Sequence, residues 1–340
     1  METLKVRANE PGAVERCAEI LKNGGLVAMP TETVYGLAAN AFDERAVRGI
    51  FAAKGRPGDN PLIVHICALR MLRDIVEEIP ESAWKLAAAY WPGPLTMILK
   101  KKPAVPDAAS GGLPTVAVRF PAHPVARRLI ELSGVPLAAP SANLSGQPSP
   151  TTFAHCVRDL DGRVDAILDG GPCPVGVEST VVTLAEEVPT LLRPGFVTLE
   201  ELRQTLGRVE VSHAVLERLG EGETASSPGM KYKHYAPKAK VTLIKGPVGS
   251  YADYVNGHAG QGVFALCFDE DAPMLRVKAV RYGPRDSGQE QARRLFDALR
   301  ELDDLGARTV FAHSPAAEGV GLAVYNRLVR AAGFDIVELS

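Results

Sequence analysis

Cysteine is scarce in this sequence and never occurs in a motif. The five cysteines are scattered singly, their number is odd, and no CxxC pair occurs: Cys17, Cys67, Cys156, Cys173 and Cys267. A disulfide framework needs an even set, and a zinc site needs ligands at close spacing. The pattern therefore predicts free thiols in a reducing compartment, and it predicts no zinc site.

Long hydrophobic runs, a secretion signal and an excess of one charge are also missing. No apolar run approaches the length of a membrane span, and the first residues, METLKVRANEPGAVERCAEI, lack the order of a signal peptide. These features predict a cytoplasmic protein without membrane contact. The net charge of −2, from 38 basic and 40 acidic residues, argues against nucleic-acid binding by bulk charge.

Familiar nucleotide motifs are missing as well. The sequence contains no GxxxxGK[ST] phosphate-binding loop. GPVGS, which follows the strand-like VTLIK, lacks the full glycine spacing of a dinucleotide turn. Nucleotide binding, if present, has to use another kind of site.

The chain has 340 residues, 46% of them hydrophobic and 23% charged, which is typical of a globular protein with two domains. Amphipathic helical patterns and short apolar strands alternate over the first two hundred residues, with glycine and proline between them. This alternation predicts an α/β domain with a mixed sheet covered by helices. EGETASSPGMKYKHYAPKAKV then lacks apolar periodicity and reads as a linker, and a smaller doubly wound α/β domain follows. The predicted boundaries are 1–208, 209–238 and 239–340.

Polar side chains gather where predicted strands end. They lie in PTETVYGLAAN, KGRPGDN, TVAVRFP, PSANLSG, GVEST and LLRPG. Taken singly, each has a structural explanation: the hydroxyls can cap helices or close turns, and Lys54 and Arg56 can be a solvated helix C-terminus. His65 on a strand is more often a satisfied core histidine than a ligand contact. Taken together, beside glycine or proline and next to strands, they favour a polar pocket at the ends of the sheet.

The same motifs carry a resemblance. PTETVYGLAAN, KGRPGDNPLIVHI, WPGPLTMIL, TVAVRFP, APSANLSG, GVESTVV and LRPG, in this order, resemble the Sua5/YrdC family over roughly residues 10–200. SSPGMKYKHYAPKAKV and the domain after it resemble the longer Sua5 branch. The resemblance implies a twisted mixed sheet with a large concave cavity, a Rossmann-like C-terminal domain, and a linker that closes over the cavity.

The resemblance also implies an activity. The family makes threonylcarbamoyl-AMP from L-threonine, bicarbonate and ATP, with release of pyrophosphate, for the threonylcarbamoyl modification of adenosine 37 in tRNAs that read ANN codons. Mg²⁺ would arrive with ATP, with no metal ligands from protein side chains. The implied partners are these small molecules and the transferase machinery that uses the product, with a weak tRNA contact.

The resemblance distributes the polar residues between two sites in one hollow. The implied threonine site consists of Thr33, His65, Arg119, Ser179 and the backbone near Ala139. The implied ATP site consists of Lys54, Arg56, Asn60, Thr115, Ser141, Asn143, Ser149 and Arg193, with Tyr232 or Tyr235 of the linker nearby. Lys54 and Arg56 are the catalytic candidates, facing the triphosphate. Arg119 suits the threonine carboxylate because its planar guanidinium can bond both oxygens.

Alternatives remain at this stage. A protein that binds tRNA or double-stranded RNA without chemistry could use a similar concave surface, although near-neutral charge and the lack of stacking motifs weaken it. A carbamoyl-transfer module of hydrogenase maturation proteins would carry further acylphosphatase-like and cysteine-rich segments, and neither occurs here. The second domain could be regulatory, and the linker could be a solvated basic connector instead of a lid.

Overall fold

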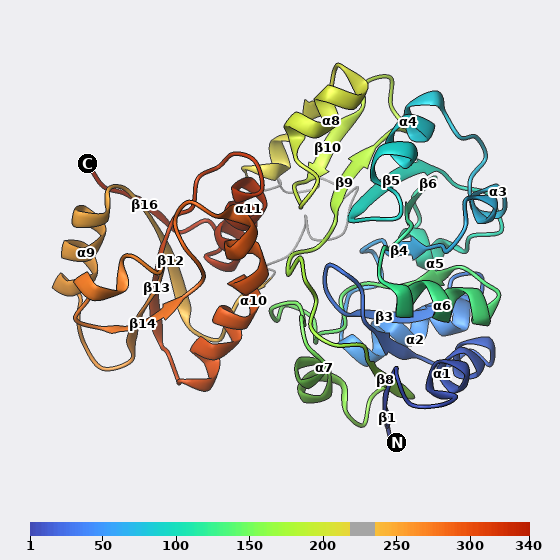
Figure 1. Ribbon diagram of the computed structural model, residues 1–340, viewed down its shortest axis with the longest axis horizontal. Coiled ribbons are helices and arrows are strands. Elements are labelled where there is room, and N and C mark those ends of the chain that lie inside the picture. Colours follow the sequence, from blue (N-terminus) through green and yellow to red (C-terminus); the bar gives the residue numbers. More distant parts are fainter. Residues whose placement is uncertain (218–234) are drawn as a thin grey trace.

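The computed structural model describes residues 1–217 and 235–340, which form two α/β units (Figure 1). In the described residues, the first unit contains an 11-stranded sheet in the order β1-β8-β2-β3-β7-β4-β6-β5-β9-β10-β11. Neighbouring strands are parallel in some pairs, such as β4 with β6, and antiparallel in others, such as β5 with β6. The predicted mixed sheet is confirmed.

The strands of the first sheet are short, and most of their residues are buried. They are β1 (Leu4–Arg7), β2 (Val27–Met29), β3 (Gly36–Asn40), β4 (Ile63–His65), β5 (Leu95–Lys100), β6 (Thr115–Arg119), β7 (Leu137–Ala138), β8 (Ala166–Asp169), β9 (Thr180–Thr183), β10 (Thr190–Arg193) and β11 (Glu210–Val211). Helices of this unit are α1 (Ala13–Lys22), α2 (Glu44–Lys54), α3 (Leu72–Ile75), α4 (Glu81–Tyr90), α5 (Asp107–Ser110), α6 (Pro124–Ser133), α7 (Phe153–Leu160) and α8 (Leu199–Leu206), with 3₁₀ turns at Leu69–Met71 and His213–Val215.

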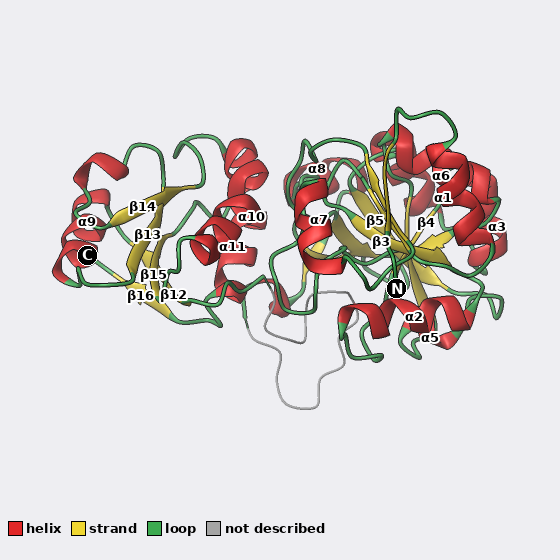
Figure 2. Ribbon diagram, turned by 90° about the horizontal axis from the view of Figure 1, so that it is seen from below, coloured by secondary structure: helices red, strands yellow, loops and turns green. Residues whose placement is uncertain are grey.

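Helices cover both faces of this sheet (Figure 2). On one face, α1 and α6 bury apolar residues such as Leu21 and Leu129 in one core cluster. On the other, α2 buries Val47 and Ile50 in a second cluster. A helix-covered sheet buries both faces of its strands, which explains why the strands read as nearly continuous apolar runs.

Local sequence fixes the ends of α2, and these ends matter for the site. The Asp43 side chain accepts hydrogen bonds from the Arg45 and Ala46 amides and caps the first turn. Gly55, with φ of 62°, ends the helix in the left-handed region, where glycine has no steric penalty. The helix therefore stops directly after Lys54, and the chain turns so that Arg56 leaves the helix axis.

The second unit is a five-stranded sheet in the order β14-β13-β15-β12-β16, in which all neighbours are parallel. The strands are β12 (Lys240–Lys245), β13 (Val263–Cys267), β14 (Lys278–Arg281), β15 (Thr309–His313) and β16 (Ile336–Glu338). The helices are α9 (Val248–Gly257), α10 (Gly288–Asp304) and α11 (Gly321–Ala331), with a 3₁₀ turn at Ala272–Met274. Helix α9 covers one face and α10 and α11 cover the other, which confirms the predicted doubly wound domain (Figure 2).

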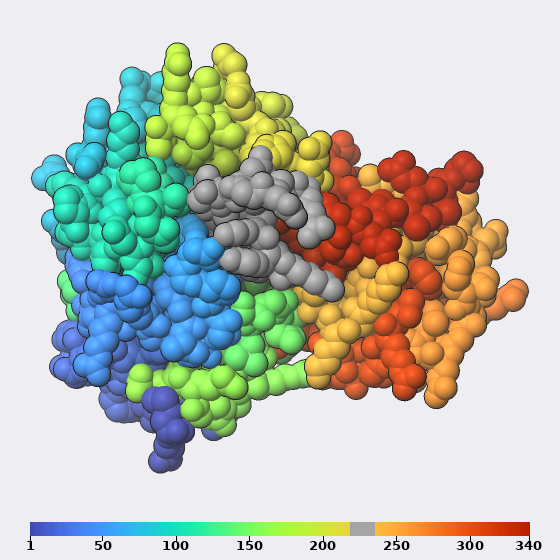
Figure 3. All heavy atoms as spheres, turned by 180° about the vertical axis from the view of Figure 1, so that it is seen from behind, coloured from blue at the N-terminus to red at the C-terminus, as the bar shows by residue number. Residues whose placement is uncertain are grey.

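The two units contact each other through α10 and α11, which face the first sheet domain (Figures 1 and 3). Arg300 of α10 forms a buried ion pair with Asp159 of α7, with an N–O distance of 2.7 Å. Asn326 of α11 donates to the Val215 carbonyl oxygen at 2.6 Å. The contact thus includes buried polar groups with defined partners, beside the apolar packing of Val34 and Val177 in the core cluster of the second unit.

The helices and strands that were not predicted from the sequence are β1, β3, β16, α3, α5, α7 and α9. At the start of the proposed linker, β11 pairs with β10, and the turn at His213–Val215 follows it. Residues 218–234, where the remainder of the linker and the expected lid would lie, fall outside the described residues. Within the described ranges, no helix has both the length and the apolar composition to cross a membrane.

Candidate active site

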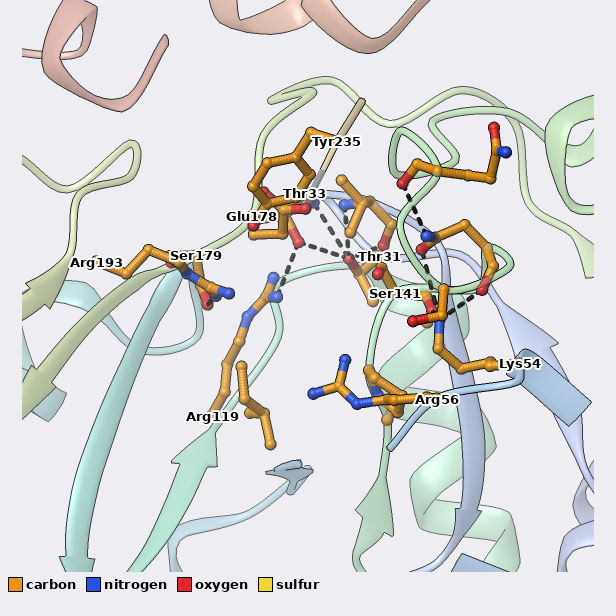
Figure 4. Close-up of a pocket in the computed structure, with 18 of the residues that line it drawn as sticks. Thr31, Thr33, Lys54, Arg56, Arg119, Ser141, Glu178, Ser179, Arg193 and Tyr235 are labelled. Atoms are coloured by element: carbon orange, nitrogen blue, oxygen red, sulfur yellow. Dashed lines mark hydrogen bonds between the residues drawn. The ribbon is translucent and has the colours of Figure 1, made fainter. Parts of the chain in front are cut away.

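A pocket opens at the strand ends of the first unit (Figure 4). It draws residues from the segments after β2, α2 and β7, from the segment before β9, and from the ends of β4, β6 and β10. The sequence-predicted residues that line it are Thr33, Lys54, Arg56, His65, Arg119, Ala139, Ser141, Asn143, Ser179, Arg193 and Tyr235. The expectation of one common polar pocket is therefore met by most of the candidates.

Arg119 lies at the centre of one wall. It ends β6 beside His65, the last residue of β4, because the two strands are parallel and in register. Its Nη1 donates to Thr33 Oγ1 at 2.8 Å, and its Nε donates to the Gly93 carbonyl oxygen at 3.3 Å. Its Nη2 lies 2.6 Å from a carboxylate oxygen of Glu32, although the two groups are not aligned for a hydrogen bond.

The charged groups of this wall shift one another's pKa values. Burial raises the pKa of Glu32, but the positive charge of Arg119, with help from nearby backbone N–H groups, outweighs burial and holds that pKa below its ordinary 4.5. Burial, with a contribution from Arg119, lowers the pKa of His65 to about 3. His65 is therefore neutral near pH 7, where its Nδ1 lies 3.1 Å from the Ile63 carbonyl oxygen.

Arg193 and Ser179 form the adjoining wall. Arg193, at the end of β10, donates from Nε to the Ser179 carbonyl oxygen at 3.1 Å and from Nη2 to Ser179 Oγ at 3.2 Å. Ser179 Oγ also lies 2.7 Å from Thr96 Oγ1 of β5. A side chain at Gly195 would overlap the backbone of Ser179 and Thr180, so the glycine of LRPG allows this close approach.

Lys54 stabilises the pocket wall formed by the loop after β7. Its ammonium donates to the carbonyl oxygens of Ser141 and Asn143, the latter at 2.6 Å, and lies 3.5 Å from Asn143 Oδ1. Burial, and secondarily Arg56, lowers the pKa of Lys54 well below its ordinary 10.5. Lys54 thus fixes the loop that follows β7, and it lines the pocket with a side chain that already has three oxygen partners.

Arg56 follows the C-terminus of α2 and also lines the pocket. Figure 4 shows its guanidinium directed toward the same space as those of Arg119 and Arg193. Its Nη2 donates to the Pro61 carbonyl oxygen at 3.2 Å and lies 3.4 Å from that of Asn60. Three arginines from different elements therefore converge on one volume.

Three other sequence-predicted residues do not line the pocket. Asn60 is buried behind Arg56, and its Oδ1 has no hydrogen-bond partner within the described ranges. Thr115 begins β6, roughly 13 Å along the strand from Arg119 at the usual rise per residue. Ser149 is fully buried and donates to a carboxylate oxygen of Glu178. Tyr232 lies outside the described residues.

Several residues that line the pocket were not among the predicted site residues, and Thr31 and Glu178 are two of them. Thr31 accompanies Thr33, with their hydroxyl oxygens 2.9 Å apart, and lines the pocket. Glu178 also lines it and is 6% exposed. Glu178 could have been found from its position in GVEST, directly before the predicted site residue Ser179. It was not chosen because the sequence predicted a site for anions, where a carboxylate is unexpected.

The structure offers little for a protein-bound metal. No group of three or more His, Cys, Asp or Glu side chains that could hold a metal occurs in residues 1–217 and 235–340. The two carboxylates near the pocket, Glu32 and Glu178, each face an arginine. The pocket instead presents guanidinium groups, hydroxyls and backbone groups, which suit phosphate and carboxylate groups.

The fold and the pocket together define a two-domain α/β protein with a small-molecule site at the strand ends of its first domain. Residues 19–195 match the Sua5/YciO/YrdC family, described as telomere recombination, and residues 197–333 match the Sua5 C-terminal domain, described as the threonylcarbamoyl-AMP synthase C-terminal domain. The chain belongs to the Sua5/YrdC family, in its long two-domain form.

Relatives support this assignment over the whole chain. The threonylcarbamoyl-AMP synthase of Pyrococcus abyssi is 45% identical over 97% of this chain and 97% of its own length. That of Bacillus subtilis is 43% identical, over 98% of this chain and 97% of its own length. A crystal structure of P. abyssi Sua5 complexed with L-threonine is similar with a TM-score of 0.92, at 44% identity, over 100% of both chains.

Proposed function

We propose that this chain is a threonylcarbamoyl-AMP synthase, a nucleotidyltransferase that condenses L-threonine, bicarbonate and ATP and releases pyrophosphate. The observation that carries the proposal is the convergence of Arg56, Arg119 and Arg193 on one hydroxyl-lined pocket. Full-length similarity to proteins of that name, one of them with L-threonine bound, supports it. The product would feed the tRNA threonylcarbamoyl transferase machinery in the cytoplasm.

The chemistry requires positioning more than a protein nucleophile. The amine of threonine takes up bicarbonate, with loss of water, to give a carbamate. A carbamate oxygen then attacks the α-phosphorus of ATP, and the bond to pyrophosphate breaks. The protein has to hold two anions close together and stabilise the charge that grows on the leaving group.

The pocket divides into two parts for this task. Arg119, Thr33, His65, Ser179 and the backbone at Ala139 hold threonine, with the Arg119 guanidinium on its carboxylate. Neutral His65 can take part in a hydrogen bond here without adding charge.

Arg56, Arg193, Ser141 and Asn143 hold ATP, together with Tyr235, which lines the pocket. Mg²⁺ enters with ATP as part of the substrate and is held by phosphate oxygens. Lys54 contributes by fixing the loop that contains Ser141 and Asn143. The resemblance also assigns Asn60, Thr115 and Ser149 to the ATP site, and of these Ser149 donates a hydrogen bond to Glu178.

The proposed domain division is 1–208, a linker at 209–238, and 239–340. In the lid hypothesis, the linker closes over the pocket and shields the labile acyl phosphate from water. Deletion of 226–237 should then abolish or uncouple synthesis while both domains stay folded. Full activity of the deletion variant would contradict the lid.

Incubation with isotopically labelled bicarbonate, threonine and ATP tests the function. We expect a labelled threonine–AMP adduct that requires all three substrates and appears with pyrophosphate. Valine in place of threonine should give much less product, because a site built for the side-chain hydroxyl rejects an isostere without it. A tRNA affinity that falls with salt, with no adenylate formed, would instead favour the RNA-binding alternative.

A further inference from the structure

One arginine of the second domain reaches the wall of the active site. Arg327 lies on α11 and is fully buried. Its Nε donates to Glu178 Oε2 at 3.0 Å, and its Nη1 donates to the Pro194 carbonyl oxygen at 2.6 Å. Both partners belong to the first domain, in the GVEST and LRPG motifs.

The contacts of Arg327 continue into the pocket. Its guanidinium carbon lies 5.8 Å from the ring centroid of Tyr235, which lines the pocket. The other oxygen of Glu178 accepts a hydrogen bond from Ser149 Oγ. Arg327 therefore holds two wall residues of the site at once, one through an ion pair and one through its ring.

The charge of Glu178 makes its ion pair with Arg327 important for ligand binding. A carboxylate that lines a pocket for anions repels them unless a cation balances it. Burial raises the pKa of Glu178, but Arg327, Arg193 and Ser149 outweigh burial and keep that pKa below its ordinary 4.5. Glu178 is thus a fixed negative charge beside Arg193, and Arg327 is the cation that pairs with it.

We propose that Arg327 is a positioning residue of the active site, supplied by the second domain, which pairs with Glu178 and supports Tyr235 so that the Glu178 carboxylate does not oppose binding of the ATP phosphates beside Arg193. The proposal rests on the proposed function and assigns the second domain a part in it. Without Arg327, Glu178 either repels the triphosphate or turns to Arg193 and neutralises it. Docking of the second domain thereby completes the ATP site.

Arg300 provides a matched comparison within the same interface. It is also a buried arginine of the second domain, and it pairs with Asp159 at 2.7 Å and donates to the Pro148 carbonyl oxygen at 2.6 Å. Neither Asp159 nor Arg300 lines the pocket. The two arginines therefore hold the interface in the same way, and only Arg327 does so through a wall of the site.

The test compares Arg327→Gln with Arg300→Gln in the full-length chain. Both should lower the melting temperature, since each leaves a buried carboxylate without its partner. We expect Arg327→Gln alone to weaken Mg·ATP binding, measured as KM and by calorimetry, by about tenfold or more, with a smaller change in KM for threonine. Arg300→Gln should leave both values within about twofold of the wild type.

A charge-balanced double variant separates electrostatics from folding. Glu178→Gln with Arg327→Gln removes both charges, so no buried charge is left unpaired, and it should recover most of the ATP affinity lost in Arg327→Gln. If Arg327→Gln does not fold, the ATP affinity of the double variant can still be compared with that of Arg327→Lys. Lysine keeps the charge, and the Arg327→Lys variant should bind ATP with intermediate affinity, because one ammonium cannot replace every contact of the guanidinium.

The outcomes are distinguishable. Equal ATP affinities of Arg327→Gln and Arg300→Gln, or a double variant no better than Arg327→Gln, would overturn the proposal. If the wild-type protein makes no adenylate, the proposed function is overturned instead. Calorimetry with Mg·ATP would still measure whether Arg327→Gln weakens ATP binding.

Discussion

Arg119 and Thr33 are joined by a hydrogen bond of 2.8 Å across 86 positions of the chain. Arg119 ends β6, and Thr33 follows β2, so the bond connects two strand ends that are not neighbours in the sheet. The same guanidinium lies beside Glu32. The pocket wall at Arg119 is therefore preorganised before any ligand arrives.

Arg119→Lys should impair threonine use specifically. Lysine keeps the positive charge but loses the planar pair of donors that suits a carboxylate. We expect kcat/KM for threonine to fall by roughly 30-fold, about 2 kcal/mol, with a smaller effect on KM for ATP. The exposed Arg128→Lys on α6 is the control. An unchanged kcat/KM in Arg119→Lys would remove Arg119 from the threonine site.

Lys54→Met should reduce stability and activity together. The substitution leaves the buried carbonyl oxygens of Ser141 and Asn143 without their donor, at about 1–3 kcal/mol for each unsatisfied group. The loop that carries Ser141 should then lose its fixed position, and kcat/KM should fall. Urea unfolding and steady-state kinetics measure the two effects. Unchanged stability with lost activity would show that Lys54 acts on the substrate alone.

His65 predicts a pH dependence of stability. Its pKa is lowered from 6.5 to about 3, so between these values the unfolded chain binds a proton that the folded chain does not. The contribution of neutral His65 is fully present above pH 6.5 and falls as the pH drops toward 3, by at most about 1.4 kcal/mol per pH unit.

His65→Asn removes this titration. Urea unfolding of the wild type and of this variant at several pH values above 4 should show a stability difference that changes in favour of the variant as the pH falls. Parallel curves would contradict the low pKa. The pH–rate profile should show no step from His65 between pH 6 and 8.

Gly176→Ala should disturb domain docking. Gly176 has a φ of 83°, and a Cβ there would lie 2.5 Å from the Ala292 carbonyl oxygen of α10 and overlap the Arg293 backbone. Gly171→Ala is the matched control, because Gly171 has a φ of 87° and open space at the Cβ position. Both substitutions should lower the free energy of unfolding by about 1 kcal/mol, because alanine is disfavoured in the left-handed backbone conformation.

Only Gly176→Ala should also separate the domains, which scattering and limited proteolysis would detect, and it should raise KM for ATP as Arg327→Gln does. Identical behaviour of the two alanine variants would mean that the interface tolerates the added methyl group.

The sequence predicted most of the larger elements, although not α9, because their patterns are local. The helix 44–54 has its cap, its apolar face and its terminal glycine between Asp43 and Gly55, and the strand at PLIVHI is a short apolar run between breakers. Strands β1 and β16 were missed because few of their residues are buried, which leaves little apolar pattern. The roles assigned to individual site residues stay predictions.

The sequence by itself determined the family, the two α/β units and the set of arginines and hydroxyls at strand ends, because these depend on motifs and periodicities within short segments. The tertiary structure alone decided that Lys54 supports a loop from inside, that Asn60 and Thr115 lie outside the pocket lining, and that Arg327 reaches Glu178 from 149 positions away. Such pairings depend on how separate elements pack, and no local pattern in the chain encodes which buried charge will meet which.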